Sequence, residues 1–374
     1  MTGIFIYWKE ISECNLSGIN NKVKVQIDAF NKFDLNCSLY VLPFQYGLSA
    51  PQQLICRLPF SNLNPTWNYS ADFEEVDYIY FRRPLCITRH TLKVLKEIRK
   101  NNTKVKIIME IPTYPYDKEL LCQAKLWPFY LKDVINRRNL KEYIDRIAVF
   151  TEDSELFGIP AIRFTNGIDL EQIKVKDAGK KDGNNIDLIV VSSFEEWHGY
   201  DRILKSLGEY YKGNPDNKRS VYLHMVGDGQ NMHEYRQIVE KYKIQDYVKF
   251  YGRVYGKELD VIYNISDIAV DVLGMYRKNN NISCSLKSRE YFAKGLPVIS
   301  GCMIDLLEDV DGFKYFRQFP NDSSLINIDD VIRFYDDVYN IAGRDKIIRS
   351  IRDFADKNCG MDKGMEKVIE YIKS

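Results

Sequence analysis

The chain has 374 residues, of which 45% are hydrophobic and 28% charged, a composition typical of a globular protein rather than a disordered chain. This length exceeds what one hydrophobic core usually supports, so we expect two domains. The 53 Lys and Arg residues balance the 52 Asp and Glu residues to a net charge of +1. Because no overall basic field would attract the protein to nucleic acid, we expect no nucleic-acid partner.

The cysteines and the first residues indicate the cellular compartment. Eight cysteines follow no C-x-x-C motif and no regular spacing, which favours free thiols in a reducing cytoplasm. The apolar run after Met1 is too short for the core of a signal peptide, and no basic residue precedes it. No segment approaches the roughly 20 apolar residues of a membrane span. We therefore expect a cytoplasmic protein, either free or at the inner face of the cell membrane.

Short runs rich in Val, Ile, Leu and Tyr alternate with amphipathic segments of helical length. Several runs are nearly continuous, as in strands buried on both faces of a parallel sheet. The expected strands are 3–7, 37–42, 78–81, 105–110 and 146–150, followed by 186–192, 221–226, 248–251, 268–273 and 297–300. Residues 171–185 lack periodicity and are rich in Lys, Asp, Gly and Asn, which predicts a linker. The pattern predicts two doubly wound α/β domains with ligands at the carboxyl ends of the strands.

One segment has the features of a helix whose start binds an anion. Ser285 suits an N-cap, residues 286–294 favour a helix, and Gly295 suits its end. The unpaired backbone N–H groups at Ser285 and Leu286, together with the positive end of the helix dipole, would attract a negative group.

Two side chains extend this interpretation. Lys287 adds a cation in the first turn, and Glu290 lies on the same face about one turn, roughly 5.4 Å, further along the axis. The spacing suits a diphosphate at the helix start and a ribose beside it, whose hydroxyls would donate to the Glu290 carboxylate. From the spacing alone, a surface helix with an ordinary Glu stays an equal alternative.

The segment 285–297 resembles the donor-site helix of the GT-B glycosyltransferases, specifically the retaining glycosyltransferase family 4. Four other segments resemble motifs of that family in the family's order, so the resemblance extends along nearly the whole chain. They are 164–169, 191–202, 224–229 and 248–254. The forms Trp-His-Gly-Tyr-Asp-Arg and Ser-Leu-Lys-x-Arg-Glu-Tyr resemble a subgroup found among bacterial surface-polysaccharide transferases.

The resemblance implies a GT-B fold, in which two Rossmann-like domains face each other across a cleft. Residues 1–170 would bind the acceptor and residues 186–355 the nucleotide sugar, with the linker 171–185 between them. Residues 356–374 would form a C-terminal helix that returns to the first domain.

The implied activity is a hexosyltransferase-type transfer from a UDP- or GDP-sugar to a saccharide or lipid-linked saccharide, with retention, in surface-polysaccharide synthesis. The resemblance implies no cofactor and no metal. Asp309 and Asp311 form the Asp-x-Asp string of metal-dependent transferases with another fold, but Gly312 after them indicates a turn.

The resemblance also implies site residues. Lys287, Arg202 and the N–H groups at Ser285 and Leu286 would neutralise the leaving diphosphate. The other implied donor contacts are Glu290, His198, Gly229, Arg253, Val254 and, in a loop of the first domain, Gly18.

Three positions depart from the family pattern. Ile282 stands where the family has the first Glu of a Glu-x7-Glu pair, which leaves recognition of the sugar open. Ser193 and His198 stand where the family has an Arg and Lys pair in the phosphate-binding turn. The alternatives are therefore a GT-B-like nucleotide-sugar epimerase or phosphorylase, or a catalytically inactive binding or scaffold homologue.

The first domain offers candidates for acceptor binding. Arg82 or Arg83 could hold an acceptor phosphate, but not both, because two successive residues of a strand face opposite sides of the sheet. An equal alternative is that both arginines lie on the protein surface and bind no ligand. The loop after strand 105–110 contains two prolines that stiffen it and position Tyr114 and Tyr116. Asp117 is a candidate acid or base, with helix capping as its alternative.

Residues 125–141 mix Trp, Phe and Tyr with Lys and Arg. This composition suits a segment that lies on anionic lipid, which would fit a lipid-linked acceptor. The alternative is that the aromatic side chains belong to the core and the cations are simply solvated.

Overall fold

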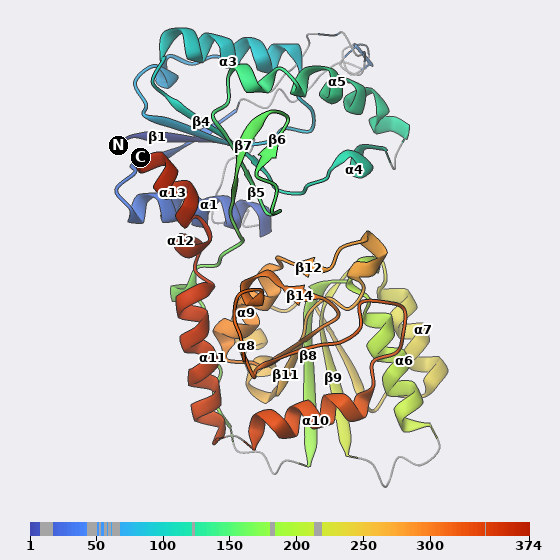
Figure 1. Ribbon diagram of the computed structural model, residues 1–374. Coiled ribbons are helices and arrows are strands. Elements are labelled where there is room, and N and C mark those ends of the chain that lie inside the picture. Colours follow the sequence, from blue (N-terminus) through green and yellow to red (C-terminus); the bar gives the residue numbers. More distant parts are fainter. Residues whose placement is uncertain are drawn as a thin grey trace. The chain divides into compact units, whose positions relative to one another are not determined.

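The computed structural model describes residues 1–7, 18–42, 51, 54–55, 58, 61, 68–121, 124–179, 184–212, 219–340 and 342–374. The chain divides into two compact units, shown in Figure 1. The first unit comprises Met1–Thr165 and Met361–Ser374, and the second comprises Asn166–Gly360.

The first unit is built on one sheet with the strand order β2-β1-β3-β4-β5-β7-β6. Every neighbouring pair is parallel except β6 and β7, which form a short antiparallel hairpin at one edge. The strands are β1 (Gly3–Tyr7), β2 (Cys37–Val41), β3 (Tyr78–Arg82), β4 (Lys106–Ile111), β5 (Arg146–Val149), β6 (Glu155–Leu156) and β7 (Ile159–Arg163).

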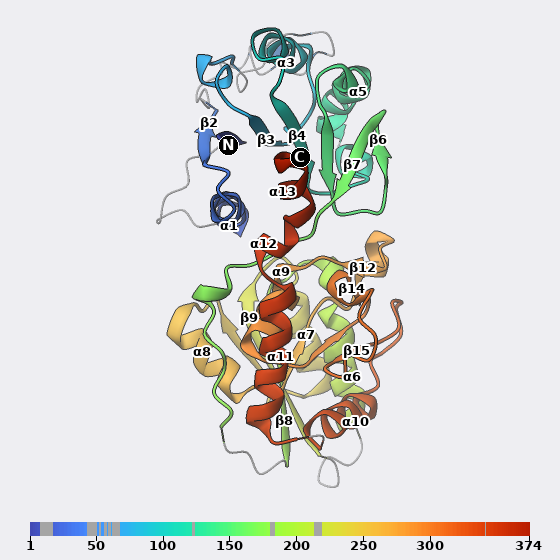
Figure 2. The same cartoon turned by 60° about the vertical axis from the view of Figure 1, so that its left-hand side comes forward.

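Helices cover both faces of this sheet. They are α1 (Gly18–Lys32), α3 (Arg89–Asn101), α4 (Asp117–Leu121), α5 (Trp127–Arg137), α12 (Met361–Gly364) and α13 (Glu366–Lys373). Because side chains alternate along a strand, Tyr78 and Tyr80 of β3 pack on Phe30 of α1, whereas Ile79 and Phe81 belong to the cluster beneath α3. In both views α12 and α13 lie beside α1, on the Tyr80 face (Figures 1 and 2).

The second unit has a six-stranded parallel sheet with the order β10-β9-β8-β11-β13-β15, and a separate parallel pair, β12 and β14. The strands are β8 (Asn185–Ser193), β9 (Ser220–Asp228), β10 (Val248–Gly252), β11 (Ile268–Val270), β12 (Ile282–Ser283), β13 (Val298–Ser300), β14 (Met303–Ile304) and β15 (Phe316–Gln318). The helices are α6 (Tyr200–Tyr211), α7 (Met232–Tyr242), α8 (Gly256–Ile265), α9 (Leu286–Lys294), α10 (Ile328–Tyr339) and α11 (Arg344–Asn358).

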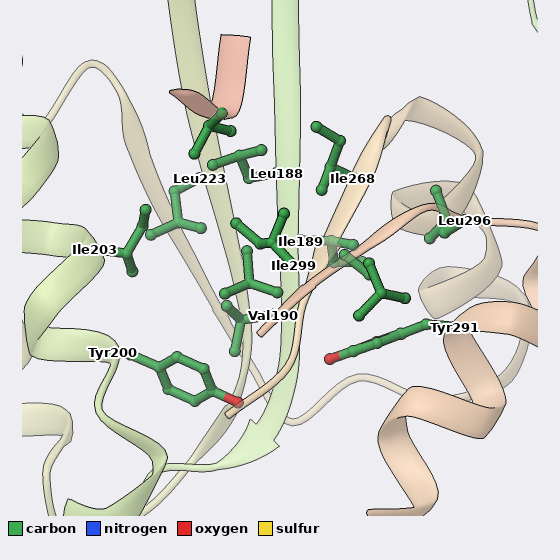
Figure 3. Close-up of a cluster of buried hydrophobic side chains, with 14 of the residues drawn as sticks. Leu188, Ile189, Val190, Tyr200, Ile203, Leu223, Ile268, Tyr291, Leu296 and Ile299 are labelled. Carbon is green, nitrogen blue, oxygen red and sulfur yellow. The ribbon is translucent and has the colours of Figure 1, made fainter. Parts of the chain in front are cut away.

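The core of the second unit explains its continuous apolar strands. Leu188, Ile189 and Val190 are consecutive in β8, and all three are fully buried because helices cover both faces of the sheet. Figure 3 shows these side chains between Ile203 of α6 and Tyr291 of α9.

All ten strands expected from the sequence are present, each within three residues of its expected bounds. The divisions between the units differ from the expected ones. The first lies between Thr165 and Asn166 rather than at 170, and the second between Gly360 and Met361 rather than at 355. Part of the expected linker is bound to the second unit, where the Lys176 backbone N–H donates to the Lys294 carbonyl.

Candidate functional site

The start of α9 has the geometry expected from the sequence. Ser285 is its N-cap with extended backbone, and its hydroxyl accepts the backbone N–H of Ser288 at 3.2 Å. At the other end Gly295 adopts φ +84° and donates to the Phe292 carbonyl. The helix therefore spans Leu286–Lys294, and its first backbone N–H groups lie close to the carboxyl ends of β8 and β11.

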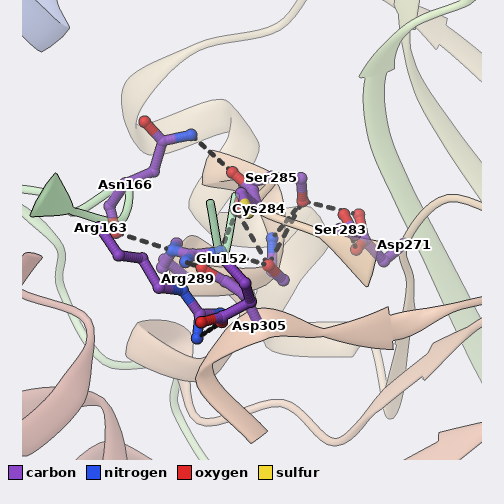
Figure 4. Close-up of polar contacts among 10 residues, drawn as sticks. Glu152, Arg163, Asn166, Asp271, Ser283, Cys284, Ser285, Arg289 and Asp305 are labelled. Carbon is purple, nitrogen blue, oxygen red and sulfur yellow. Dashed lines mark hydrogen bonds and ion pairs between the residues drawn. The ribbon is translucent and has the colours of Figure 1, made fainter. Parts of the chain in front are cut away.

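Buried side chains hold this helix start in place (Figure 4). The Asp271 carboxylate follows β11 and is fully buried, and it accepts from the hydroxyls of Ser285 at 2.9 Å and Ser283 at 3.4 Å. On the other side the buried Arg289 guanidinium donates to the carbonyls of Ser285 and Asn166, and also to Asp305. The loop before α9 is thus anchored from two directions.

Lys287 carries a positive charge at the start of α9. Its ammonium donates to Ser192 Oγ at 3.2 Å and to the Tyr200 hydroxyl at 3.3 Å. Burial lowers the pKa of Lys287 to about 8, although the carboxylates of Asp271 and Glu290 favour the charged form. Within the described part of the chain, no carboxylate forms an ion pair with this ammonium. At neutral pH the group is still mostly protonated and its charge is available to an anion.

His198 stands close to Lys287 but adds no charge. Its Nδ1 accepts the backbone N–H of Glu195 at 3.2 Å, and its ring stacks on Tyr200. Burial, with the nearby Lys287 charge, lowers the pKa of His198 to about 3, so the imidazole is neutral under ordinary conditions. His198 thus shapes the turn after β8 and does not replace the cation found there in the family that the chain resembles.

Glu290 lies one turn further along α9 and lines a cavity of about 220 Å³ in the second unit. The other lining residues include Gly256, Asp260, Tyr263 and Lys294. Burial raises the pKa of Glu290, opposed by the charges of Lys294 and Lys287. The Tyr263 hydroxyl is buried and has no hydrogen-bond partner among the described residues. Carboxylate and phenol together offer an acceptor and a donor to a polyhydroxyl group.

Three further donor-site predictions fall on turns at the carboxyl ends of β9 and β10. Gly229 packs so closely on the turn after β8 that a Cβ would lie 2.5 Å from the Phe194 nitrogen. Arg253 is exposed, with Nε 3.8 Å from Asp228 Oδ2, and Val254 packs partly against the core. These residues share an edge of the sheet, but nothing in their own contacts assigns them a ligand.

The phosphate-neutralising role expected of Arg202 is not supported. Its side chain is only 2% exposed. Its Nε and Nη2 donate to the carbonyls of Ser324 at 2.7 Å and Pro320 at 3.0 Å, and its Nη1 donates to that of Leu273. The guanidinium is thus committed to three backbone carbonyls, and Arg202 is a structural residue.

The acceptor-side predictions are dispersed over the first unit. Gly18 is the first residue of α1, and the loop before it lies outside the described residues. Asp117 begins α4 and forms an ion pair with Arg137 at 2.6 Å. Arg82 is 7% exposed and lies beside Glu110.

Tyr114 and Tyr116, the two aromatic candidates for acceptor binding, mainly contact other residues of the first unit. Tyr116 is 1% exposed and donates its hydroxyl to Asp133 at 2.7 Å, so its expected contact with an acceptor is not supported. Tyr114 is half-buried and packs edge-on against Tyr116 and Phe157.

Within 125–141 the structure departs from the alternative interpretation, in which the aromatic side chains are in the core and the cations are solvated. Lys132, Asp133 and Asn136 of α5 are buried, whereas Trp127 and Leu131 are 54% and 49% exposed. Among the described helices, none is long and apolar enough to cross a bilayer.

The sequence reasoning missed Ser192 and Tyr200, the two hydroxyl partners of Lys287. It also missed Asp271, which fixes the start of α9. Ser192 and Tyr200 lie within the segment 191–202, which already resembled a phosphate-binding turn, so a search for hydroxyls there could have found them. Asp271 gave no local signal, because its partners are 12 and 14 residues away.

Solved structures define the class to which this architecture belongs. Similar structures include sucrose-phosphate synthase from Thermosynechococcus elongatus, with a TM-score of 0.62, 13% identity, and coverage of 100% of this chain and 99% of that one. A glycosyltransferase from Rickettsia africae has a TM-score of 0.60, 12% identity, and coverage of 100% and 97%. HepE from Anabaena, solved in complex with UDP, has a TM-score of 0.56, 12% identity, and coverage of 100% of both chains. The protein has the GT-B fold of glycosyltransferases, as the sequence predicted.

The sequence gives a more particular match within the second unit. Residues 171–302, which include β8 to β13 and all of α9, match the family described as "Glycosyl transferases group 1". No curated protein sequence matches the chain. Fold and family match together indicate a glycosyltransferase.

Proposed function

We propose that the protein is a retaining family 4 hexosyltransferase that moves a sugar from a UDP- or GDP-sugar to a saccharide or lipid-linked saccharide, in bacterial surface-polysaccharide synthesis. The observation that carries the donor part of this proposal is the ammonium of Lys287 at the capped start of α9, which forms no ion pair with the described residues, with Glu290 one turn further on. HepE, which shares the fold, was solved with UDP, and this supports a nucleoside diphosphate as the donor's nucleotide part.

The donor would bind to the second unit through two contacts. Lys287 and the first backbone N–H groups of α9 would hold the diphosphate, since both present positive charge to it. The ribose would enter the cavity lined by Glu290, whose carboxylate accepts hydrogen bonds from the ribose hydroxyls. Gly229, Arg253 and Val254 would face the remaining parts of the nucleotide.

The proposed chemistry depends on the leaving group. As the bond between the sugar C1 and the diphosphate oxygen breaks, negative charge grows on the diphosphate. Lys287 and the α9 N–H groups are already oriented toward that charge, because Asp271 and Arg289 fix the loop before the helix. An acceptor hydroxyl then bonds to C1 on the face that the diphosphate leaves, and its proton passes to the departing diphosphate oxygen. We propose neither a metal nor a cofactor in this step.

The proposed acceptor site lies in the first unit, with Arg82, Tyr114 and Asp117 as its candidate contacts. Trp127, Leu131 and Ile135 are exposed and recur every four residues on α5, so they lie on one face of that helix. Arg138 and Lys141 follow them and are exposed. We propose that this face touches an anionic membrane when the acceptor is lipid-linked, which would place the enzyme at the inner face of the cell membrane.

A binding and turnover experiment tests the donor site. We expect UDP or GDP, but not both equally, to raise the Tm of the wild-type protein by mass action. Lys287→Ala should weaken this shift and lower transfer about 100-fold, whereas Lys357→Ala, an exposed lysine of α11, should change neither. Unchanged turnover of Lys287→Ala at saturating donor would rule out the proposed role.

Ile282 favours a second candidate function, a nucleotide-sugar-binding protein without transferase activity. The side chain at this position cannot accept a hydrogen bond from the donor sugar, unlike the Glu in the family pattern. The same assay separates these two functions from each other and from an epimerase. A transferase releases nucleotide in the presence of the acceptor, an epimerase interconverts the sugar without acceptor, and an inactive homologue binds the donor and releases no nucleotide.

A further inference from the structure

A buried charged cluster lies in the first unit, at the carboxyl ends of β3 and β4 beside the start of α1. We call Lys22, Arg82 and Glu110 the cationic cluster. Arg82 is the last residue of β3 and lies on the same strand face as Tyr78 and Tyr80, which pack on α1. Lys22 belongs to α1 and Glu110 to β4. All three side chains are at least nine-tenths buried.

The carboxylate of Glu110 already accepts three hydrogen bonds. Its Oε1 accepts from Lys22 Nζ at 3.2 Å, and its Oε2 accepts from Gln26 at 2.8 Å and from the Tyr80 hydroxyl at 2.9 Å. Although burial opposes ionisation, the charges of Lys22 and Arg82 and these hydrogen bonds lower the pKa of Glu110 to about 2. Glu110 is therefore ionised, and the cluster has two cations for one anion.

Arg82 lacks partners that a buried guanidinium needs. Its Nε lies 3.7 Å from Glu110 Oε1, which is beyond hydrogen-bond distance, and neither Nε nor Nη1 has a hydrogen-bond partner among the described residues. Burying a charged donor without a partner is unfavourable, so native proteins rarely leave one in this state. Arg202 in the second unit shows the ordinary arrangement, with each nitrogen bonded to a carbonyl.

The start of α1 adds to the positive potential around Arg82. Asn20 lies in the first turn of this 15-residue helix and accepts from the Tyr7 hydroxyl at 2.9 Å. Burial raises the pKa of the Tyr7 hydroxyl, and the positive charge of Arg82 lowers it. Arg82 therefore interacts electrostatically with this hydroxyl, which in turn is bonded to the first turn of α1. A helix start, a guanidinium with two donors that lack hydrogen-bond partners, and two cations for one anion among the described residues of the cluster together favour an anion there.

We infer that the cationic cluster binds a phosphate group carried by the acceptor. The planar guanidinium can donate two parallel hydrogen bonds, which matches two phosphate oxygens, and each of the unpartnered donors, Nε and Nη1, shares an edge of it with Nη2. The inference rests on the proposed function, since it names the chemical class of that enzyme's acceptor. The phosphate comes from a soluble sugar phosphate or from a lipid-linked phosphate, and both present the same group to Arg82.

Titration of inorganic phosphate into the full-length protein, followed by calorimetry, tests the site. We expect Arg82→Gln to weaken phosphate binding at the cationic cluster at least tenfold. Arg99→Gln is the matched control, because Arg99 lies in the same unit and donates to the carbonyls of Tyr143 and Val105 and to Asp145. Equal affinity in Arg82→Gln and the wild type would overturn the inference and leave water as the partner of Arg82.

A second variant covers the case in which Arg82→Gln does not fold. Arg82→Lys keeps the charge and removes the paired donors, so it should fold and still bind phosphate several-fold more weakly than the wild type. Affinity equal to that of the wild type would contradict bidentate binding by Arg82 and overturn the assignment.

Titration of UDP separates this inference from the proposed donor site. We expect UDP affinity to be the same in Arg82→Gln and the wild type; a loss would assign the anion to the donor diphosphate and overturn the acceptor assignment. Absence of UDP binding to the wild type, with Arg82-dependent phosphate binding retained, would refute the donor site alone. Displacement of phosphate by a soluble hexose phosphate, or by vesicles that contain a polyprenyl phosphate, then identifies the source. Displacement by neither probe would overturn the acceptor assignment.

Discussion

Lys287 has a pKa of about 8 because its ammonium is buried, and this value makes donor binding dependent on pH. A bound diphosphate favours the protonated amine, so at pH above 8 the protein must take up a proton when the donor binds. UDP affinity should therefore fall as the pH rises from 8 to 10. His198, whose pKa is about 3, does not change charge between pH 8 and 10, so it does not contribute to the change of UDP affinity with pH.

Replacement of the titrating group checks this dependence. Lys287→Arg keeps a positive charge at every pH in the range, so its UDP affinity should vary much less between pH 8 and 10. Calorimetric titration at several pH values measures both slopes. Identical slopes for the wild type and Lys287→Arg would assign the pH dependence to another group.

Glu290 gives a second prediction at the residue scale. Glu290→Gln keeps the shape of the side chain but removes the charge that strengthens hydrogen bonds to the ribose, which are worth about 1.5–3 kcal/mol. We expect the Kd for UDP to rise about tenfold. Uridine diphosphate with both ribose hydroxyls replaced by hydrogen should bind equally to Glu290→Gln and the wild type. A tenfold difference with that analogue as well would show that Glu290 does not contact the ribose.

At the scale of the element, the end of α9 is as constrained as its start. Gly295 has φ +84°, and a Cβ there would lie 2.6 Å from Ile348 Cγ2 and 2.9 Å from the Ile348 carbonyl oxygen, both on α11. Gly295→Ala should therefore combine backbone strain of about 1–2 kcal/mol with a packing penalty of about 1–3 kcal/mol.

Gly312 is the matched control for this prediction. It has φ +72°, and a Cβ at this position would have no atom within 4 Å. Gly312→Ala should therefore destabilise the protein only through the backbone strain of about 1–2 kcal/mol. Chemical denaturation of both variants measures the difference in free energy of unfolding. Equal destabilisation would show that α11 moves away from Gly295 at no measurable cost.

The elements that the sequence predicted well are those with strong local signals. The N-cap Ser285 and the terminal Gly295 fixed both ends of α9, and continuous runs such as Leu188–Val191 marked the buried strands. The hairpin β6–β7 and the short strands β12, β14 and β15 were missed. They are two to five residues long, and β7 contains Pro160, which argues against a strand.

The site residues were predicted less well because their roles depend on distant partners. Arg202 looked like a spare cation in the sequence, but carbonyls from Leu273, Pro320 and Ser324 converge on it in the fold. Tyr116 looked like a loop aromatic, but Asp133 of α5 binds its hydroxyl within the core. No spacing along the chain reports such contacts, which span from 17 to more than 120 residues.

At the scale of the whole molecule, each unit has its own buried core, so equilibrium unfolding should depart from a single two-state transition. We expect differential scanning calorimetry to resolve two transitions. UDP should raise only the transition of the second unit, which contains Lys287 and Glu290. A uniform shift of both transitions would contradict independent unfolding.

The C-terminal helix allows the two transitions to be assigned. Val368 of α13 is fully buried in the first unit, so Val368→Asp should destabilise that unit by at least about 3 kcal/mol through a buried unpaired charge. Lys367→Asp places the same side chain at the neighbouring exposed position and should have little effect. The transition that moves in Val368→Asp belongs to the first unit; loss of both transitions would show that the units unfold together.

The return of residues 361–374 to the first unit sets an order for folding on the ribosome. Translation proceeds from the N-terminus, so all of Asn166–Gly360 is made before Met361, Met365 and Ile372 can enter their core. The first unit, whose synthesis begins first, is thus the last to be completed. Until then its β-sheet bears an uncovered apolar strip, which is where a nascent-chain chaperone would find its binding surface.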